Sequence, residues 1–371
     1  MTVNIVDLLL LCMEKKASDL HLTAQMPPIL RIHGELVIMR DIPPIKRDDL
    51  RRMIYGCLTD AQKEKFEKEL ELDFSLHFPN TDRFRVNVHM QRGSVEAAFR
   101  RVTSSIPSWE SLGLPPVVKE LARKPNGLIL VTGPTGVGKS TTLAAMVDLI
   151  NQEFSKLIIT IEDPIEYLHR HGKSIVKQRE VHQDTLSFAN ALRHVLRQDP
   201  DVIVVGEMRD LETISTAITA AETGHLVLAT LHTVDAAQTV ERIIDVFPPH
   251  QQQQIRLQLA DCLQAVLSQQ LLKRQDGQGR VLAMEVMTCT PAVRNVIREM
   301  RIEQIPNLIQ TGSQYGMQSM DSSIRDLYAR GIVGYEEAAT YMKDPSLLER
   351  TKPGRVGGRG NEDKREGLRF W

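Results

Sequence analysis

Apolar and polar side chains alternate along an early segment of the chain. Every second residue of 83–90 is apolar, namely Phe84, Val86, Val88 and Met90. A period of two predicts a strand with one buried face and one exposed face. A second strand is expected at Asp73–Phe78, among short signals for other strands and helices. Residues 1–105 are therefore predicted to form a small α+β domain.

After Gly127 the pattern changes to continuous apolar runs separated by helical stretches. The apolar runs are Leu128–Thr132, Leu157–Ile161, Val202–Val205 and Leu226–Leu231. The helical stretches between them are Ser140–Gln152, Leu186–Gln198 and Leu211–Glu222. Continuous apolar strands are buried on both faces, which is typical of a parallel sheet covered by helices. The fold class is therefore predicted to be α/β, with this core at residues 126–290.

The rest of the chain completes a plan of two domains with connecting and terminal parts. Repeated prolines in 106–125 predict a linker, because proline breaks helices. Past Pro248 the signals are mostly helical, with Gln251–Lys273 expected as one long helix and Ala292–Arg301 as a shorter one in a helical region at 291–350. Residues 351–371 are rich in Gly, Arg and Lys and are predicted to be disordered.

Composition excludes several classes of protein. The chain has 371 residues, of which 42% are hydrophobic and 25% charged, and its formal net charge is −1. A protein that neutralises many phosphates is strongly basic, so no nucleic-acid partner is expected. The four cysteines form no C-x-x-C pair, which argues against a zinc cluster or a disulfide framework. The apolar run near Val6 is interrupted by Asp7 and is too short for a signal or a membrane span, so we expect an amphipathic first helix and a cytoplasmic location.

The strongest chemical signal is a glycine-rich loop between a predicted strand and a predicted helix. Its residues are Gly133, Pro134, Thr135, Gly136, Val137, Gly138, Lys139 and Ser140, with Thr141 beyond them. This pattern in this context is typical of a phosphate-binding loop, whose backbone N–H groups and helix N-terminus face an anion. Lys139 is expected to reach the β- and γ-phosphates of ATP, and the Ser140 hydroxyl to hold Mg²⁺. The alternative is a glycine turn that binds no ligand.

A second candidate, Glu207, follows the run Val202–Val205. Open α/β sheets place their ligands at the carboxyl ends of the strands. Glycine occupies position 206, where such strands usually end in aspartate. Glu207 is therefore the candidate for orienting Mg²⁺ or its waters, and the alternative is a simple ion pair with Arg209.

A third candidate, Glu162, follows the run that ends at Ile161. Pro164 turns the chain away just after Glu162 and Asp163. A carboxylate held there can orient the water that attacks the γ-phosphate or accept its proton. Glu162 is favoured over Asp163 and Glu166, and the alternative is an acidic turn that faces solvent.

Two histidines flank the run Leu226–Leu231. A strand of this length separates His225 from His232 by about 23 Å, which excludes a shared metal. His232 is expected at the carboxyl end of the strand, where a hydrogen bond would report the state of the nucleotide. The alternative is a structural histidine.

Several arginines are candidates for phosphate contacts from an adjacent domain or subunit. Arg193 and Arg197 share one helical face, and Arg83, Arg85, Arg100 and Arg101 lie on predicted strands. Most are expected to be surface charges or ion-pair partners. Arg83, Arg100 and Arg197 are the candidates for phosphate contacts.

Taken in order, these motifs resemble the PilT family of type IV pilus retraction ATPases, within the type II/IV secretion ATPase superfamily. The resemblance extends from about residue 1 to 345. The segments that carry it, besides the phosphate loop, are Ala17–Thr23, Ile161–Tyr167, Arg179–Asp184, Asp199–Asp210 and Gly224–Thr233. The helix Ala292–Glu299 resembles a further family motif that is associated with retraction.

The resemblance implies a PAS-like amino-terminal domain, a RecA-like ATPase core, ATP bound between the two domains, and a homohexamer. It implies that Glu162 is the catalytic carboxylate and Glu207 the Walker B carboxylate, and that glycine before Glu207 is normal. The expected function is an ATP-driven motor for pilus retraction, which acts on an inner-membrane platform protein from the inner face of the cytoplasmic membrane.

Other functions stay open at this stage. Within the same superfamily the alternatives are a pilus assembly or type II secretion ATPase, whose typical four-cysteine metal cluster is not visible here, and an accessory retraction paralogue. From different classes they are a nucleotide-dependent scaffold that does not hydrolyse ATP and a nucleic-acid motor.

Overall fold

The computed structural model describes residues 4–32, 34–79, 81–102, 106–349 and 351. Contacts within the chain divide it into two compact units. Among the described residues, the first unit comprises those within 4–108, 140–220 and 225–229, and the second comprises those within 109–139, 221–224 and 230–351. The predicted disorder at 352–371 lies outside the described residues.

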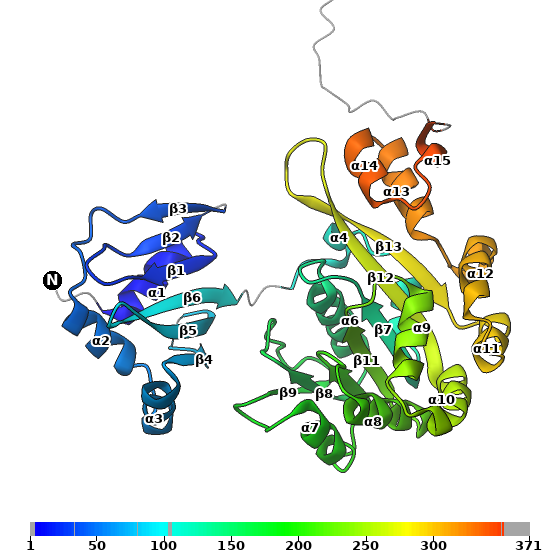
Figure 1. The fold of residues 1–371 in the computed structure, drawn as a ribbon, viewed down its shortest axis with the longest axis horizontal. Coiled ribbons are helices and arrows are strands. Elements are labelled where there is room, and N and C mark those ends of the chain that lie inside the picture. The colour runs from blue at the N-terminus through cyan, green and yellow to red at the C-terminus, as the bar shows by residue number, and fades with distance from the viewer. Residues whose placement is uncertain (1–3, 33, 80, 103–105, 350, 352–371) are drawn as a thin grey trace, which may run out of the picture. The chain divides into compact units, whose positions relative to one another are not determined.

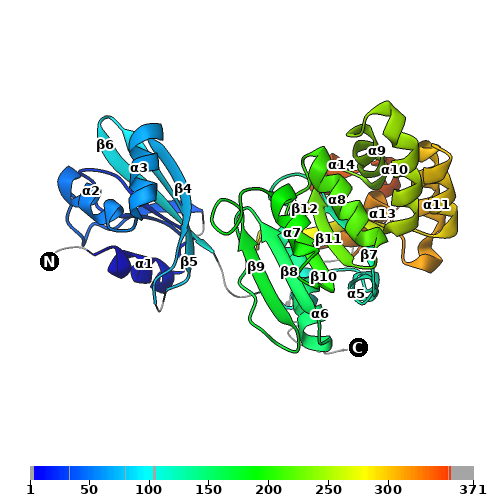
Figure 2. The ribbon, with the colours of Figure 1, turned by 90° about the horizontal axis from the view of Figure 1, so that it is seen from below.

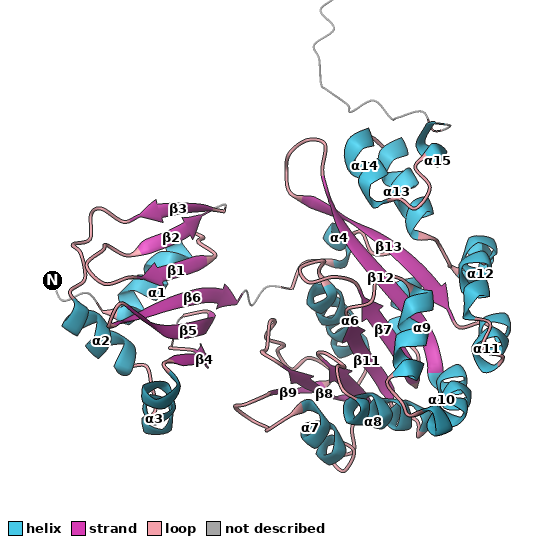
Figure 3. Ribbon diagram, viewed as in Figure 1, coloured by secondary structure: helices cyan, strands magenta, loops and turns pink. Residues whose placement is uncertain are grey.

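The amino-terminal part of the first unit is an antiparallel sheet (Figure 3). Its strands are β1 (Asp19–Leu22), β2 (Ile29–Ile32), β3 (Glu35–Ile38), β4 (Glu71–Leu76), β5 (Arg83–Gln91) and β6 (Ser94–Val102). Their order is β3-β2-β1-β6-β5-β4. The alternation predicted for 83–90 is confirmed for Phe84, Val86 and Val88, which are buried, whereas Met90 near the end of β5 is exposed.

Helices α1 (Ile5–Glu14), α2 (Arg47–Tyr55) and α3 (Asp60–Glu69) belong to the same part of the chain. Asn4 caps α1, and Thr59 and Gln62 form a reciprocal capping box on α3, which satisfies backbone N–H groups that have no partner inside a helix. Leu9, Leu50 and Phe66 from these helices join one apolar core with the buried side chains of the strands. The helical first segment and the α+β character predicted from the sequence are confirmed.

A second sheet follows, with the strand order β13-β12-β7-β11-β10-β8-β9. Its strands are β7 (Gly127–Thr132), β8 (Leu157–Glu162), β9 (Ile175–Glu180), β10 (Val202–Val205), β11 (Leu226–Leu231), β12 (Leu263–Lys273) and β13 (Arg280–Thr288). The strands β9, β8, β10 and β11 pair in parallel, as do β12 and β7, while β13 runs antiparallel to β12. The predicted parallel strands are confirmed, and the sheet gains an antiparallel edge that was not predicted.

Helices connect these strands and continue beyond them (Figure 1). They are α4 (Trp109–Leu112), α5 (Val117–Ala122), α6 (Lys139–Glu153), α7 (Phe188–Val195), α8 (Leu211–Glu222), α9 (Ala236–Asp245), α10 (Pro249–Cys262), α11 (Pro291–Arg298), α12 (Ile305–Thr311), α13 (Met320–Ala329), α14 (Tyr335–Tyr341) and α15 (Ser346–Glu349). In the second unit, α9, α10 and α11 lie side by side (Figure 2). No helix among the described residues has the length and hydrophobicity that a bilayer crossing requires.

The prediction of one long helix at Gln251–Lys273 is wrong, because α10 ends at Cys262 and the chain continues directly into β12. The Leu, Gln and Ala residues of 263–272 have good intrinsic helix propensity. However, the segment is largely buried and pairs with β7 on one side and β13 on the other. The tertiary environment therefore overrides local propensity here.

The segment predicted as a linker, 106–125, contains the two short helices α4 and α5. Pro116 occupies the N-cap position of α5. Proline is tolerated at a helix start because the first N–H groups of a helix have no intrahelical partner. Pro116 therefore marks the start of α5, and the prolines do not exclude helices from the segment.

Candidate functional site

The glycine-rich loop connects β7 to α6, as predicted. Gly133 has φ +136°, which L side chains rarely adopt. A Cβ atom at Gly133 would lie 2.6 Å from the carbonyl oxygen of Gln269, so only glycine fits at this position. Beyond it, Pro134, Thr135 and Gly136 are exposed. The loop thus begins tightly packed against β12 and continues into the exposed residues 134–136.

Lys139 lies buried at the end of this loop. Its Nζ donates hydrogen bonds to the carbonyl oxygens of Gly133, over 2.6 Å, and of Pro134, over 3.0 Å. The same Nζ lies 3.4 Å from Nδ1 of His232, which follows β11. The second unit therefore brings the phosphate-loop lysine and the predicted sensor histidine together. His225 lies elsewhere, with Nδ1 2.9 Å from the carbonyl oxygen of Ala220.

The first turn of α6 carries the other two predicted hydroxyl groups. Ser140 is partly buried. The Thr141 hydroxyl forms a hydrogen bond of 2.8 Å with the Tyr167 hydroxyl, and Tyr167 belongs to the segment that follows β8. This bond ties the start of α6 to the acidic segment within the first unit.

Glu162 ends β8 and is held by two side-chain donors. Its Oε1 accepts from the Thr160 hydroxyl over 2.6 Å and from Nε2 of Gln178 over 3.0 Å. Burial raises the pKa of Glu162, and these hydrogen bonds only partly oppose that shift. Asp163 and Glu166 are exposed. The environment thus distinguishes Glu162 from its neighbours as the carboxyl group suited to proton transfer.

Gly206 explains why glycine replaces the usual aspartate at the end of β10. Its N–H donates to the carbonyl oxygen of Ile161 over 2.8 Å. A Cβ atom at Gly206 would lie 3.1 Å from that oxygen and 3.2 Å from Cα of Glu162. Any side chain would therefore press on the backbone that positions the Glu162 carboxylate.

Glu207 forms a bidentate ion pair with Arg209. Nε and Nη2 of Arg209 donate to the two carboxylate oxygens over 2.5 and 2.7 Å. The ion pair offered as the alternative in the sequence analysis is therefore present. The Arg209 side chain is 73% exposed, whereas that of Glu207 is 18% exposed.

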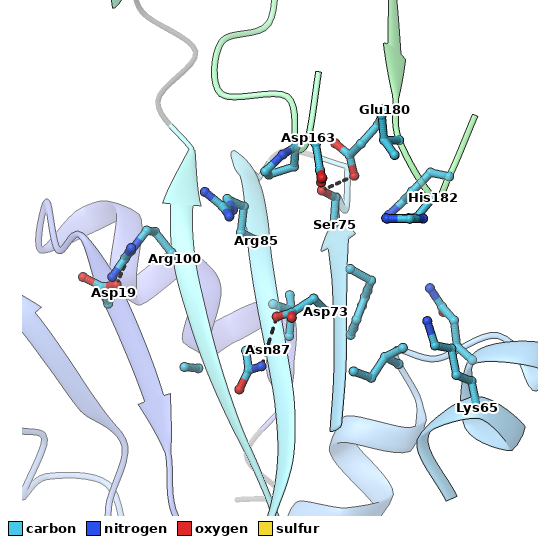
Figure 4. Close-up of a pocket in the computed structure, with 18 of the residues that line it drawn as sticks. Asp19, Lys65, Asp73, Ser75, Arg85, Asn87, Arg100, Asp163, Glu180 and His182 are labelled. Carbon is cyan, nitrogen blue, oxygen red and sulfur yellow. Dashed lines mark hydrogen bonds and ion pairs between the residues drawn. The ribbon is translucent and has the colours of Figure 1, made fainter. Parts of the chain in front are cut away.

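Two of the three candidate arginines are ion-pair partners in the first unit. Arg83 donates to the buried carboxylate of Glu180 over 2.6 Å. Arg100 donates to Asp19 over 2.8 Å (Figure 4). Arg197 lies beyond the end of α7 and is exposed.

Arg100 also lines a pocket of about 670 Å³ in the first unit. Carboxylates share the lining, including Asp73, which accepts a hydrogen bond from Asn87 (Figure 4). The pocket carries charges of both signs and does not resemble an anion site.

Comparison with known proteins identifies the family. Residues 7–340 match the family described as Type II/IV secretion system protein. The type IV pilus retractation ATPase PilT of Pseudomonas aeruginosa is 48% identical over 343 residues, which cover 92% of this chain and 99% of that protein. This chain belongs to the PilT family. A twitching motility protein of Neisseria gonorrhoeae is 49% identical over 311 residues, which cover 84% of this chain and 83% of that protein.

A solved structure agrees with this assignment. The crystal structure of the pilus retraction motor PilT with bound ADP has a TM-score of 0.88 and 49% sequence identity, and the match covers 94% of this chain and 100% of that one. The PilT-family chain is therefore an ATPase with the α/β fold of that motor, and it has a site for ATP or ADP.

Sequence reasoning missed the residues of this PilT-family chain that support the predicted ones. Thr160 could have been found, because it is polar within an apolar run and lies two residues before Glu162 on the same face of the strand. Gln178 gave no signal, since β9 was not predicted. Arg280, whose Nη1 donates to the carbonyl oxygen of Gly136 over 3.3 Å, comes from the unpredicted strand β13.

The family motif on α11 has a structural role in this PilT-family chain. Nη1 of Arg294 donates to the carbonyl oxygens of Ala260 and Asp261, and Nη2 donates to that of Leu263 over 3.2 Å. These carbonyls end α10, where the backbone lacks intrahelical donors. One guanidinium therefore joins α11 to the end of α10.

Arg294→Ala is expected to lower the free energy of unfolding by about 1–3 kcal/mol, because it leaves these carbonyls without their donor. Arg294→Lys should recover only part of the loss, since an ammonium lacks the planar fork. Urea unfolding of the two variants measures the effect. Equal stability of Arg294→Ala and the wild type would show that water satisfies these carbonyls equally well.

Proposed function

We propose that this chain is the motor whose ATP hydrolysis powers the retraction and depolymerisation of type IV pili. The observation that carries the proposal is the buried Lys139 in a glycine-rich loop, in a chain that is 48% identical to a pilus retractation ATPase over 92% of its length. The glycine conformation at 133 and the exposure of residues 134–136 suit the phosphates of a nucleotide. With nucleotide bound, Lys139 exchanges the carbonyl oxygens of Gly133 and Pro134 for phosphate oxygens, and His232 responds to that exchange.

A divalent cation suits the polar groups that follow the loop and β10. Mg²⁺ neutralises phosphate charge and orients the leaving and attacking oxygens when it is bound. The Ser140 hydroxyl would hold it directly and Glu207 would hold it directly or through water. Oxygen ligands are those that Mg²⁺ prefers. Glu207 becomes available when its exposed partner Arg209 turns to solvent.

Glu162 is proposed to act as the base that orients the attacking water and receives its proton. Thr160 and Gln178 hold the carboxylate in one orientation. The order of the strands supports the joint action of Glu162 and Glu207, because β8 and β10 are neighbours, Glu162 ends β8 and Glu207 follows β10. Hydrolysis is therefore favoured over the role of a scaffold that only binds nucleotide.

The motor is proposed to work as a homohexamer, in which a PAS-like domain at 1–105 and a RecA-like core at 126–290 move relative to each other as ATP is hydrolysed. The linker at 106–125 would join them, and the helices at 291–350 complete the subunit. Its partner would be the inner-membrane platform protein of the pilus machinery, at the inner face of the cytoplasmic membrane. Arg197, which is exposed, is the arginine proposed to contact phosphate across subunits.

Purified protein is expected to hydrolyse ATP only when Mg²⁺ is present, so EDTA should abolish turnover and added Mg²⁺ should restore it. Ser140→Ala should raise the Mg²⁺ concentration that gives half-maximal turnover, because one ligand is lost. Ser111→Ala, at an exposed serine of α4, is the matched control and should match the wild type. Turnover that persists in EDTA would contradict the proposed metal site.

A further inference from the structure

The loop that carries His232 leads directly into α9. Thr233 and Thr239 share a hydrogen bond of 2.7 Å between their hydroxyls, and the Thr239 hydroxyl donates to the backbone oxygen of Asp235 over 2.6 Å. Asp235 caps α9, since its side chain accepts from the N–H of Gln238 over 2.9 Å. The segment 232–235 thus has the Lys139 ammonium beside one end and a helix N-terminus at the other.

A buried carboxylate from a distant strand fixes the helix end of this segment. Glu285 on β13 is 7% exposed, and its Oε1 accepts from the N–H of Ala236, the first residue of α9, over 2.9 Å. Burial raises the pKa of this carboxyl, and the backbone N–H of Met320, the first residue of α13, is among the groups that oppose the rise by favouring the charged form. One carboxylate therefore lies at the N-termini of two helices, where the helix dipoles favour negative charge.

Further contacts hold α13 to the same part of β13. The N–H of Val286 donates to the carbonyl oxygen of Gln318 over 2.8 Å, and the N–H of Gln318 donates back to Val286 over 3.1 Å. The Ser323 hydroxyl accepts from the N–H of Met284 over 3.1 Å. The start of α13 cannot move far without moving Glu285.

A lysine from the segment after α14 completes the cluster. Nζ of Lys343 donates to Oδ2 of Asp235 over 2.8 Å, and the Asp235 side chain is only 13% exposed. The backbone N–H groups of Lys343 and Asp344 donate to the carboxylate of Asp321 on α13, over 2.9 and 3.0 Å. The ammonium thus lies where it offsets the charges of three carboxylates, Asp235, Glu285 and Asp321.

From this arrangement we infer that Glu285 and Lys343 are positioning residues, which hold the segment 232–235 so that His232 stays beside Lys139. The carboxy-terminal helices α13 to α15 are thereby coupled to the nucleotide end of β11. The inference rests on the proposed role of His232 in ATP hydrolysis and goes beyond it, because it assigns the control of that residue to groups remote from the phosphate loop.

Charge balance explains why Lys343 matters despite its own exposure. Without the ammonium, Asp235 and the buried Glu285 repel each other, and only Asp235 can move toward solvent. Since Asp235 lies three residues after His232, its displacement shifts the histidine. Without Glu285, the first N–H group of α9 loses its buried acceptor.

Two test variants and two comparisons separate this role from a merely structural one. Lys343→Met removes the charge and keeps the apolar stem, and Lys343→Arg restores the charge. Glu285→Gln keeps one acceptor oxygen and removes the negative charge. Arg330→Met is the matched control, because Arg330 caps the end of α13 opposite to Met320 and forms an exposed ion pair with Asp326.

Hydrogen exchange of the amides of 233–238 is measured first, on the full chain without nucleotide, followed by kcat and KM for ATP. Lys343→Met is expected to accelerate exchange in this segment and to lower kcat about 3- to 10-fold, with KM changed less than about 2-fold. Lys343→Arg should restore both values, and Arg330→Met should alter neither. Glu285→Gln should also accelerate exchange at Ala236.

Faster exchange with unchanged kcat would overturn the inference, because the position of the segment would then have no effect on hydrolysis. A lower kcat with unchanged exchange, or no change in either, would overturn it as well. Failure of the proposed role of His232 is detected separately, as an unchanged kcat in His232→Ala. Whether or not His232 acts in hydrolysis, the hydrogen-exchange measurement tests whether Glu285 and Lys343 hold the segment 232–235 in place.

Discussion

Glu162→Gln is expected to lower ATP turnover about 10²- to 10⁴-fold, which is the usual contribution of a general base. Glutamine has almost the same shape and can still accept from Thr160 and Gln178, so the site keeps its geometry and loses only the group that takes the proton. Nucleotide binding should persist. The measurement is single-turnover hydrolysis together with equilibrium binding of a fluorescent ATP analogue.

The matched control is Glu166→Gln, since Glu166 belongs to the same acidic segment and is exposed. It should retain turnover close to that of the wild type. If the turnover of Glu162→Gln also stayed within about threefold of the wild-type value, the Glu162 carboxylate would lower the activation barrier by less than about 1 kcal/mol. Glu162 would then not be the base.

The same substitution should change stability in a pH-dependent way. Burial raises the pKa of Glu162 in the folded protein above its unfolded value. Such a group contributes stability that is complete below the unfolded pKa and is lost as the pH rises through the folded pKa. At neutral pH the buried charge opposes folding, so Glu162→Gln should be more stable than the wild type there and should lose that advantage in acid. Urea unfolding of the wild type and of Glu162→Gln, at neutral pH and in acid, measures this difference in stability.

Lys139→Ala is expected to reduce turnover by about 10³-fold and to weaken nucleotide binding as well, because it removes the positive charge aimed at the phosphates. It also leaves the carbonyl oxygens of Gly133 and Pro134 without the donor they share. Binding of the fluorescent analogue and steady-state turnover test both effects. Lys124→Ala, at an exposed lysine of the same unit, is the control. A Lys139→Ala protein with normal binding would contradict the proposed phosphate contact.

Sequence predicted those parts of the site that lie within one continuous segment. Glycine spacing was sufficient to locate the loop Gly133–Ser140. Apolar runs were sufficient to locate the strands whose ends lie at or before Glu162, Glu207 and His232. The boundaries of 1–105, 106–125, 126–290 and 291–350 stay predictions.

Contacts between distant segments could not be predicted in the same way. Glu285 and Ala236 are 49 residues apart, and Glu285 lies on a strand that the sequence pattern did not reveal. The strand β12 was read as helix because its Leu, Gln and Ala residues favour helix until the neighbouring strands bury them. The sequence showed glycine in place of the usual aspartate at position 206, but only the distance of this position to the Glu162 backbone gives the reason.

The most direct test of the proposed function measures the rate of pilus retraction in a strain that lacks this chain and is complemented with the wild type or with Glu162→Gln. We expect the wild type to restore retraction and Glu162→Gln, produced at the same level, to leave pili extended, with Glu166→Gln behaving as the wild type. Normal retraction with Glu162→Gln would contradict the claim that hydrolysis at this site powers the movement.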